Sequence, residues 1–423
     1  MDKFIIEGPT PLKGVIPISG SKNAALPLMA ASLLAETPTT INLTPRLKDI
    51  YTFNNVIRVT GTEIEFKEDQ NQLVIDPSKL NFPEAPYDLV RRMRASFYML
   101  GALIGRAGEA KVSLPGGCAW GPRPVDLHLK GFEAMGINIS LEEGYVIASV
   151  DNESVEGGEF TLEPSSVGAT INLVLGAVKK AKKFVIKNAA KEPDVVLLCN
   201  TLNKMGANIK GAGTGTITVK KVDKLHGIEV SNDPDRIETG TLMIAAAMHP
   251  ESDVTLTGCK PEHLGTFPDS FKKIGVHFEI NGSEISVTPN GGINPVSIET
   301  EIYPGFPTDL QAQWATLMTQ AEGTSTVTDN IYYDRFSYVP ELRRLGADLS
   351  VDKNKVTING KNQLSGTSVM STDLRASVSL VMAAMVAKGK SDILRVYHLD
   401  RGYEQLEKKL NAVGASITRT NQE

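Results

Sequence analysis

The sequence has few cysteines and histidines, and this shortage argues against several kinds of protein. It contains 3 cysteines and 6 histidines among 423 residues. Cys118, Cys199 and Cys259 have none of the spacings typical of metal ligands, and no two histidines are spaced as ligands on one helix face. We therefore expect no metal centre, and reduced thiols rather than a disulfide framework, with Cys199 and Cys259 as packing residues.

The sequence also lacks a strong charge of either sign and a long hydrophobic run. Its 44 lysines and arginines against 49 acidic residues give a net charge of −5, so neither nucleic acid nor an anionic membrane is an expected partner. The longest apolar run, residues 24–35, is too short to span a bilayer, and residues 1–7 do not resemble a signal peptide. We expect a cytoplasmic protein that is long enough for two domains.

A stretch rich in glycine and proline, residues 113–124, carries Cys118 near Arg123. Its glycines permit unusual backbone angles and its prolines remove hydrogen-bond donors, so the stretch suits neither a helix nor a central strand. Cys118 is therefore predicted on an exposed loop. A cysteine outside a packed core is explained by reactivity better than by packing, which favours a functional thiol. A chance loop cysteine is the alternative.

A short phrase recurs six times along the chain. Each copy has an apolar residue or threonine, then glycine, then a small or branched residue, followed by alternating apolar residues. The glycines are Gly61, Gly136, Gly206, Gly275, Gly346 and Gly414, with spacings of 75, 70, 69, 71 and 68 residues. This regularity indicates an internal repeat of about 70 residues.

Each repeat is predicted to contain an apolar helix, a short strand, an amphipathic helix that ends at the glycine, and a strand or hairpin. The first helices are predicted at residues 23–34, 95–104, 168–178, 238–248, 310–320 and 374–386. Because these segments are rich in alanine, leucine and methionine, we expect them in the centre of the fold. Six such units suggest an α/β protein with two domains of three units each.

Charged or hydrogen-bonding residues recur where these first helices begin. They are Lys22, Asn23, Arg94, Ser166, Asp235, Arg236, Asp309, Asp373 and Arg375. If equivalent helices point the same way, their unpaired N–H groups and positive dipole ends form a site for anions. Ordinary capping is the alternative for Ser166, Asp235 and Asp373. Capping does not explain Lys22, Arg94 and Arg236, because a cation at this end opposes the helix dipole.

Several segments, in order along the chain, carry a resemblance to a known family. They are residues 18–25, 93–96, 114–118 with 123–128, 234–240, 306–313, 372–377 and 400–404. Together they resemble the bacterial UDP-N-acetylglucosamine 1-carboxyvinyltransferases, enolpyruvyl transferases of peptidoglycan precursor synthesis. The resemblance covers essentially the whole chain.

The resemblance implies a fold of two inside-out α/β barrel domains, each built from three repeated α/β units. This agrees with the six repeats found in the sequence. Residues 22–233 would form the domain with the catalytic loop, and residues 1–21 with 234–423 the second domain. A double crossover hinge is expected near residues 20–22 and 233–235, and substrate is expected to close the two domains.

The implied reaction transfers the enolpyruvyl group of phosphoenolpyruvate to the 3-hydroxyl of UDP-N-acetylglucosamine and releases phosphate. The resemblance implies that Cys118 is the acid that protonates the methylene carbon, and the target of the epoxide antibiotic fosfomycin. Asp309 would be the base toward the sugar hydroxyl, with Lys22 and Arg401 completing the catalytic set. No cofactor is implied, and the sequence does not predict the oligomeric state.

The resemblance also implies two sets of binding residues. For phosphoenolpyruvate they are Lys22, Asn23, Arg94, Arg123, Arg335, Arg375 and Arg401. For UDP-N-acetylglucosamine they are Asn23, Arg94, Arg123, Pro124, Val125, Asp126, Leu127, Ser166, Val167, Gly168, Asp309 and Ile331. A surface ion pair with Asp334 or Glu341 is the alternative for Arg335. Pro164 and Trp120 depart from the family pattern, which puts one diphosphate or uridine contact and the loop packing in doubt.

Two other functions remain open at this point. The shikimate-pathway enolpyruvyl transferase shares the six-unit architecture, but the cysteine loop present here is absent from it. A non-catalytic paralogue could bind a nucleotide sugar as a sensor. Cys118 and Asp309 argue against this second alternative, because binding alone requires neither an acid nor a base.

Overall fold

Contacts between residues divide the chain into two compact units. A computed structural model describes residues 2–91, 93–115 and 125–421. The inserted unit is Gly20–Asp233, and the terminal unit combines Met1–Ser19 with Pro234–Glu423. Among the described residues, the strands form six four-stranded sheets, three in each unit. Each unit has its own hydrophobic core.

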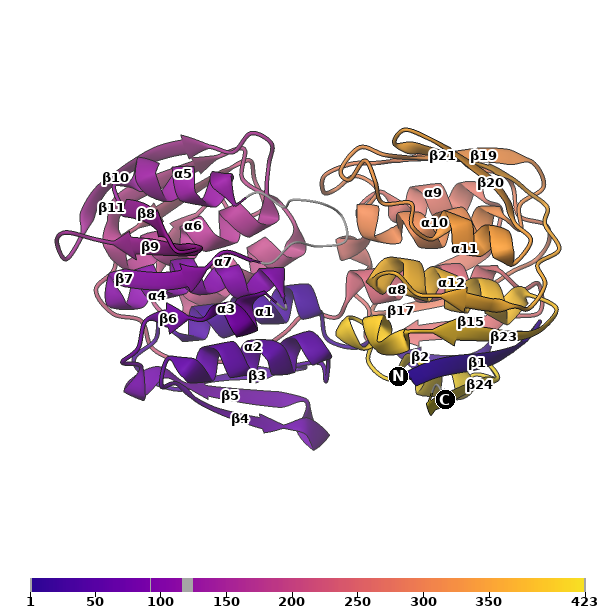
Figure 1. Cartoon of the computed structure of the whole chain (residues 1–423), viewed down its shortest axis with the longest axis horizontal. Coiled ribbons are helices and arrows are strands. Elements are labelled where there is room, and N and C mark those ends of the chain that lie inside the picture. The colour runs from indigo at the N-terminus through magenta and orange to yellow at the C-terminus, as the bar shows by residue number, and fades with distance from the viewer. Residues whose placement is uncertain (1, 92, 116–124, 422–423) are drawn as a thin grey trace. The chain divides into compact units, whose positions relative to one another are not determined.

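In the inserted unit the sheets lie outside and three apolar helices lie inside (Figure 1). The first sheet contains, in spatial order, β14 (Glu229–Ser231), β3 (Thr39–Asn42), β5 (Gln72–Asp76) and β4 (Glu63–Lys67). The second contains β6 (Glu84–Ala85), β7 (Glu109–Ser113), β9 (Tyr145–Ser149) and β8 (Asn138–Glu142). The third contains β10 (Val155–Thr161), β11 (Ala181–Lys187), β13 (Thr216–Lys220) and β12 (Asn208–Lys210). The inner helices are α1 (Lys22–Ser32), α4 (Tyr98–Ala107) and α6 (Val167–Lys180). The other helices are α2 (Lys48–Val59), α3 (Tyr87–Val90), α5 (Asp126–Met135) and α7 (Pro193–Lys204), with 3-10 turns η1 (Glu68–Gln70), η2 (Pro77–Lys79) and η3 (Arg94–Phe97).

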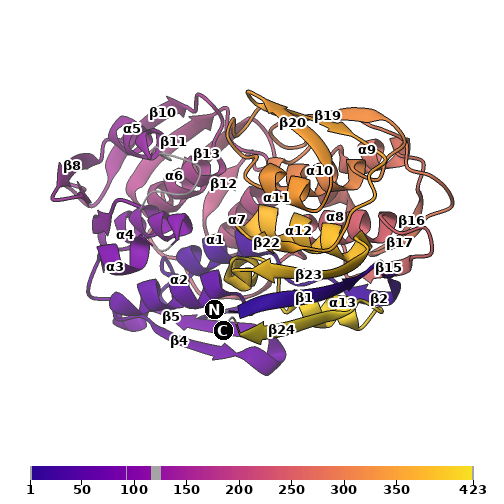
Figure 2. The same cartoon turned by 45° about the vertical axis from the view of Figure 1, so that its right-hand side comes forward.

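The terminal unit repeats this plan. Its first sheet contains, in spatial order, β2 (Lys13–Pro17), β15 (Asp253–Thr257), β17 (Glu284–Thr288) and β16 (His277–Asn281). The second contains β18 (Ile298–Thr300), β19 (Thr324–Asp329), β21 (Lys355–Asn359) and β20 (Asp348–Asp352). The third contains β22 (Ser368–Met370), β23 (Gly389–Leu394), β1 (Asp2–Gly8) and β24 (Ile417–Asn421). The inner helices are α8 (Arg236–Ala247), α10 (Gln311–Met318) and α12 (Leu374–Val386). The other helices are α9 (Phe267–Lys273), α11 (Val339–Arg344) and α13 (Leu406–Asn411), with 3-10 turns η4 (Pro261–Leu264), η5 (Thr308–Leu310) and η6 (Val396–Arg401). Both ends of the chain belong to one sheet, where β1 pairs with β24 (Figure 2).

The six repeat glycines have one structural role. Each follows the second helix of its repeat with a positive φ, between 86° and 113°. Side chains disfavour this backbone region and glycine adopts it readily, so the glycine turns the chain from the helix into the next strand. The predicted helix ends are therefore confirmed.

The first strand of each sheet was not predicted. In four repeats this strand, β6, β10, β18 or β22, comes shortly before the inner helix. In the other two it comes from a crossover segment: β14 pairs in parallel with β3, and β2 pairs in parallel with β15. The two segments that pass between the units thus also complete a sheet in each of them.

The inner helices are buried, as the sequence predicted, and two of them touch through glycines. A Cβ added at Gly101 of α4 would lie 2.2 Å from the carbonyl oxygen of Asn172 in α6, and one at Gly105 would lie 2.5 Å from that of Leu175. Glycine therefore permits the close approach. Because both pairs advance in the same direction, α4 and α6 are parallel and begin at the same end of the inserted unit.

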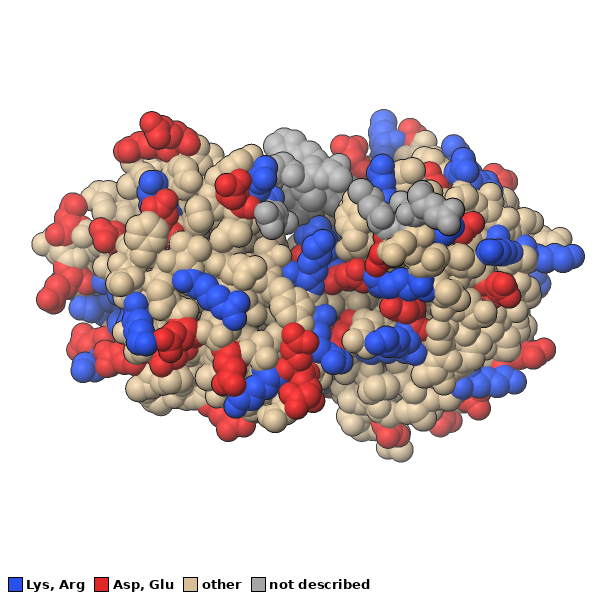
Figure 3. Space-filling model, turned by 60° about the horizontal axis from the view of Figure 1, so that its bottom comes forward, with Lys and Arg blue, Asp and Glu red and all other residues tan. Residues whose placement is uncertain are grey.

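Two predicted inner helices begin differently from the prediction. The helix predicted at 95–104 starts as the 3-10 turn η3, and that predicted at 310–320 follows the 3-10 turn η5 and ends at Met318. These tight turns carry Arg94 and Asp309. Among the described residues, no helix is long and apolar enough to cross a membrane. Basic and acidic side chains are intermixed over the face that Figure 3 shows.

Candidate active site

The residues proposed for the site fall into two groups, one in each unit. The terminal unit holds Asp309, Ile331, Arg335, Arg375 and Arg401. The inserted unit holds Lys22, Asn23, Arg94, Val125, Asp126, Leu127, Ser166, Val167 and Gly168. Residues 116–124, which include Cys118, Arg123 and Pro124, lie outside the residues that the structure describes.

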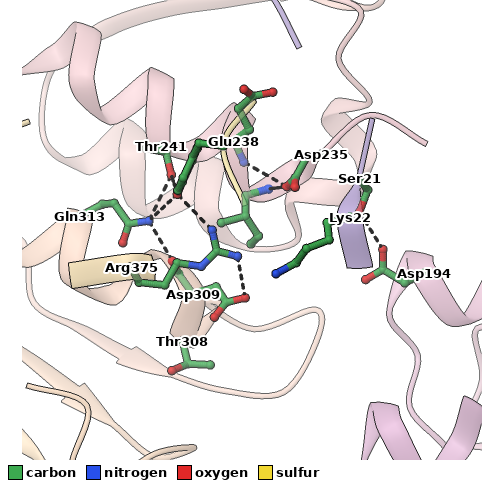
Figure 4. A network of polar contacts seen from close by, with 12 residues as sticks. Ser21, Lys22, Asp194, Asp235, Glu238, Thr241, Thr308, Asp309, Gln313 and Arg375 are labelled. Atoms are coloured by element: carbon green, nitrogen blue, oxygen red, sulfur yellow. Dashed lines mark hydrogen bonds and ion pairs between the residues drawn. The ribbon is translucent and has the colours of Figure 1, made fainter. Parts of the chain in front are cut away.

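In the terminal unit, Asp309 is bound by two arginines (Figure 4 shows the Arg375 side). Nη2 of Arg335 lies 2.7 Å from Oδ1 of Asp309, and Nη2 of Arg375 lies 3.1 Å from Oδ2. The arginine side chains are only 10% and 6% exposed, whereas that of Asp309 is 29% exposed. The carboxylate therefore offers some of its surface to solvent while both of its oxygens bind buried guanidinium groups.

The two arginines control the protonation of Asp309. Burial alone would raise the pKa of Asp309, but the charges of Arg375 and Arg335 and their hydrogen bonds outweigh burial and hold the pKa well below its ordinary value. A carboxylate in this state is a weak base. A chemical role in which Asp309 accepts a proton thus requires that the guanidinium charge be shared with another anion.

Arg375 is fixed at its backbone and at its guanidinium. Asp373 caps α12 and accepts hydrogen bonds from the backbone N–H groups of Arg375 and Ala376, at 2.8 and 3.1 Å. Nη1 of Arg375 donates to the hydroxyl of Tyr403 at 3.1 Å, and the guanidinium lies 5.6 Å from the centre of that ring. Burial lowers the pKa of Arg375, but Asp309, Tyr403 and Asp235 together outweigh burial and raise it, so the guanidinium stays charged.

Arg335 is held through Thr308 and Asp329. Nη1 of Arg335 donates to Oγ1 of Thr308 at 2.9 Å, and the Thr308 hydroxyl donates to Oδ2 of Asp329 at 2.7 Å. The other oxygen of Asp329 accepts the N–H of Ile331 at 2.9 Å. Asp329 is fully buried and thus joins the turn that carries Asp309 to the loop that carries Ile331 and Arg335. The alternative of a surface ion pair for Arg335 is wrong, because this residue is buried against Asp309.

Lys22 is the first residue of α1 and has a carboxylate partner inside its own unit. Its Nζ lies 3.0 Å from Oδ2 of Asp49, and both side chains are largely buried. Ser21 caps α1 by accepting from the N–H of Ala24, and its hydroxyl lies 3.4 Å from Asp194 (Figure 4). Asp49 thus compensates the unfavourable position of a lysine at a helix N-terminus.

The starts of α5 and α6 meet around His128. Nδ2 of Asn172 donates to Nδ1 of His128 at 2.9 Å, so the other ring nitrogen carries the hydrogen. Burial, reinforced by the charge of Arg94, lowers the pKa of His128 to about 3. A Cβ built on Gly168 would lie 3.3 Å from this ring. The neutral His128 therefore lies next to Leu127 in the chain and against the start of α6 at Gly168, where its pKa is influenced by the charge of Arg94.

The remaining proposed residues have simpler surroundings. Ser166 caps α6 by accepting from the N–H of Ala169, and Asp126 forms an exposed ion pair with Lys130 at 3.4 Å. Asn23 is the second residue of α1. Arg401 is half-buried at the end of η6, next to Asp400, which binds Arg419 at 2.6 Å. Capping thus accounts for Ser166, Asp235 and Asp373 in the structure.

Known proteins place this architecture in a family. The model for EPSP synthase (3-phosphoshikimate 1-carboxyvinyltransferase) matches residues 6–410. A relative in Chlorobaculum parvum, named UDP-N-acetylglucosamine 1-carboxyvinyltransferase, is 49% identical over 99% of this chain and 98% of its own. A protein of Chloroherpeton thalassium with the same name is 47% identical over 99% and 97%. The chain belongs to the UDP-N-acetylglucosamine 1-carboxyvinyltransferase family.

Solved structures agree with the fold predicted for this family. The enolpyruvyl transferase NikO from Streptomyces tendae superposes with a TM-score of 0.91 at 25% identity, over 100% of this chain and 99% of that one. EPSP synthase from Acinetobacter baumannii has a TM-score of 0.78 at 17% identity, which shows a common fold. The prediction of two inside-out α/β barrels built from six repeats is confirmed.

The two cysteines that the structure describes are suited to packing. Burial raises the pKa of Cys199 to about 12 and that of Cys259 to about 11. Both thiols are buried and stay protonated at neutral pH. Their burial agrees with the prediction that Cys199 and Cys259 are packing residues.

Sequence reasoning did not single out several residues that shape the site. They are Asp49, His128, Asn172, Thr241, Thr308, Gln313, Asp329 and Tyr403. Thr308, Gln313, His128 and Tyr403 lie inside the segments that carry the family resemblance, which is the one signal that could have drawn attention to them. Asp49, Asn172, Thr241 and Asp329 lie outside those segments, and only their contacts reveal them.

Proposed function

We propose that this protein transfers the enolpyruvyl group of phosphoenolpyruvate to the 3-hydroxyl of UDP-N-acetylglucosamine and releases phosphate. This reaction would be the first committed step of peptidoglycan precursor synthesis, carried out in the cytoplasm. The observation that carries the proposal is the likeness, over 99% of the chain, to relatives named for this activity. The buried arginines around Asp309 support it, because the first substrate carries two anionic groups.

Arg335 and Arg375 are proposed to bind an anionic group of phosphoenolpyruvate. In the structure they already hold one carboxylate, that of Asp309, between two guanidinium groups. Guanidinium groups match carboxylate and phosphate oxygens equally well and do not lose their charge. A substrate carboxylate or phosphate would thus find charges of the right sign and geometry at hand.

Substrate binding would at the same time prepare Asp309 as a base. As the substrate anion takes a share of the guanidinium charge, the pKa of Asp309 rises from its lowered value toward one at which the carboxylate can accept a proton. Asp309 would then take the proton of the sugar 3-hydroxyl while the oxygen of that hydroxyl bonds to C2 of phosphoenolpyruvate. The proposed base would therefore become effective only when the substrate is bound.

The addition also needs an acid, and Cys118 is proposed for this role. The thiol would give its proton to C3 of phosphoenolpyruvate as the C2–O bond forms, so that the methylene becomes a methyl group. In the elimination, C3 would return a proton to the Cys118 thiolate, the C2–C3 double bond would form again, and the bond from C2 to the phosphate oxygen would break so that phosphate leaves with the electron pair. An unperturbed thiol, with a pKa of about 8.5, is mostly protonated at neutral pH and can donate.

The nucleotide sugar is proposed to bind the inserted unit. Ser166, Val167 and Gly168 form the start of α6, a 14-residue helix whose first N–H groups suit a diphosphate. His128, the neighbour of Leu127 in the chain, lies against this start at Gly168. The segment of Val125, Asp126 and Leu127 would contact the uridine.

Phosphate release with different acceptors tests the proposed function. We expect release from phosphoenolpyruvate with UDP-N-acetylglucosamine and none with shikimate 3-phosphate. Release with shikimate 3-phosphate alone would instead support the shikimate-pathway alternative. Binding of the nucleotide sugar without release would support a non-catalytic paralogue.

Removal of single cations should weaken the use of phosphoenolpyruvate. Lys22→Ala, Arg123→Ala and Arg401→Ala should each lower kcat/KM for phosphoenolpyruvate by well over tenfold, because a lost hydrogen bond to a charged group costs about 1.5–3 kcal/mol. Lys182→Ala is the control, because Lys182 is exposed and pairs with Glu156 at the surface. Steady-state kinetics with wild-type values in all three variants would contradict the proposed cation set.

A further inference from the structure

Arg375 depends on an uncharged hydroxyl as well as on Asp309. Building on the function proposed above, we infer that Tyr403, oriented by Thr241 and Gln313, is a positioning residue that keeps Arg375 in place for the substrate anion. The sequence marks this tyrosine only as part of the segment 400–404. Its role in the site follows from its contacts.

The hydroxyl of Tyr403 lies where four segments of the terminal unit meet. Tyr403 is 1% exposed and follows η6. Its oxygen lies 3.1 Å from Nη1 of Arg375 in α12, 2.9 Å from Oγ1 of Thr241 in α8, and 3.3 Å from Nε2 of Gln313 in α10. Figure 4 shows Thr241, Gln313 and Arg375 directed toward one another. One buried hydroxyl therefore links the segment that follows η6 to the three inner helices of this unit.

The donors around Tyr403 fix the direction of its own hydrogen. Arg375 and Gln313 can only donate to its oxygen, so among the described contacts of this hydroxyl Oγ1 of Thr241 is the one acceptor. The phenol hydrogen must therefore point to Oγ1 of Thr241. Gln313 donates one amide hydrogen to the backbone oxygen of Asp309 at 2.9 Å, and its other hydrogen is shared between Oγ1 of Thr241 at 3.1 Å and the Tyr403 oxygen at 3.3 Å. With its own hydrogen directed to Thr241, the Tyr403 oxygen presents an acceptor to Arg375.

An uncharged partner is suited to a site where anions exchange. If the substrate anion binds Arg375, the ion pair between Asp309 and Arg375 becomes weaker. The hydrogen bond from Arg375 to Tyr403 persists, because the Tyr403 hydroxyl is uncharged and does not compete with the substrate anion. Arg375 would therefore keep its position when its anionic partner changes, which a pair with Asp309 alone does not ensure.

Tyr403→Phe tests this inference, because it removes the hydroxyl and keeps the ring. We expect kcat/KM for phosphoenolpyruvate to fall by about tenfold to a hundredfold, as for the loss of a hydrogen bond to a charged group. The KM for UDP-N-acetylglucosamine should stay within about twofold, since that substrate is assigned to other residues. Tyr145→Phe is the control: it removes a phenol hydroxyl that accepts from the backbone N–H of Tyr87 in the inserted unit.

A double-mutant cycle separates positioning from general damage. If Tyr403 acts through Arg375, adding Tyr403→Phe to Arg375→Lys should lower kcat/KM by much less than Tyr403→Phe does alone. Full additivity of the two changes, with wild-type melting temperatures, would overturn the inference. Wild-type kinetics of Tyr403→Phe would also overturn it and leave the proposed function intact, whereas a wild-type protein that releases no phosphate would refute the function itself.

A second pair of variants covers the case in which Tyr403→Phe does not fold. Thr241→Ser keeps the hydroxyl that accepts from Tyr403, whereas Thr241→Val removes it at nearly constant volume. We expect Thr241→Ser to retain most of the wild-type kcat/KM for phosphoenolpyruvate and Thr241→Val to lose about tenfold. Equal values for the two Thr241 variants would contradict the proposed network.

Discussion

Cys118→Ser is expected to lower the turnover of this protein by a factor of about a hundred or more while both substrates still bind. The proposed reaction needs a proton at C3 of phosphoenolpyruvate, and positioned acids contribute about 10²–10⁴ in rate. A serine hydroxyl is a much weaker acid than a thiol. Phosphate release measures turnover, and calorimetric titration with UDP-N-acetylglucosamine measures binding. Turnover close to the wild-type value would remove Cys118 from the role of the acid.

The other cysteines provide the control for this experiment. Cys199 and Cys259 are buried and their pKa values are raised, so Cys199→Ala and Cys259→Ala should keep the wild-type kcat per folded molecule. Fosfomycin should add its mass to the wild type and to both controls, but not to Cys118→Ser or Cys118→Asp. Cys118→Asp should retain activity, because a carboxylic acid can also donate a proton. A fosfomycin adduct on residues 113–124 of either Cys118 variant would contradict the assignment.

The repeats made much of the fold predictable. Glycines such as Gly206 recur at nearly constant spacing because each repeat needs a positive φ where its second helix ends. The inner helix α12 was predicted with its observed bounds, because its alanine- and methionine-rich sequence carries few charges. The strands β14 and β2 could not be assigned in this way. They have three and five residues and pair with strands far away in the sequence, so no local pattern marks their partners.

The site was less predictable than the fold, because its contacts join distant positions. The resemblance named Asp309, Arg335 and Arg375, but nothing in the sequence says that they bind one another. Asp309 and Arg375 are 66 positions apart, and Thr241 and Tyr403 are 162 apart. Only the folded chain shows which carboxylate faces which guanidinium.

The cations at the helix starts illustrate this difference. A lysine or arginine there requires an anion nearby, and the sequence analysis assigned that role to substrates. The structure supplies carboxylates from the chain itself, Asp49 for Lys22 and Asp309 for Arg375. An internal carboxylate can thus stand where a substrate anion is proposed to bind. Charge balance is kept in the ligand-free protein, and the cations stay in position.

Asp309→Asn should reduce both activity and stability, because one carboxylate serves two purposes. Because Asp309 is the proposed base, its replacement should lower turnover by a factor of about a hundred or more. Its loss also leaves two largely buried guanidinium groups without their shared counter-charge, and breaking a buried ion pair costs about 3–5 kcal/mol. The melting temperature should therefore fall by about 10 °C, since each kcal/mol shifts it by about 2–4 °C in a unit of this size. Asp392→Asn is the control in the same unit, because its pair with Lys3 is partly exposed and surface pairs contribute at most about 1 kcal/mol.

The pH dependence of this difference in stability tests whether it is caused by the loss of the ion pairs between Asp309 and the two arginines. The pKa of Asp309 is lower in the folded protein than in the unfolded chain, where it is about 3.9. The ion pairs therefore contribute fully above about pH 4, and their contribution is lost as the pH falls through the folded value. The difference in melting temperature between the wild type and Asp309→Asn should accordingly be constant from about pH 5 to 8 and shrink below about pH 4. A difference that instead grows on acidification would mean that the two arginines do not stabilise the charged form of Asp309. Substrate binding could then not turn Asp309 into an effective base by sharing the guanidinium charge, and the base of the reaction would have to be another group.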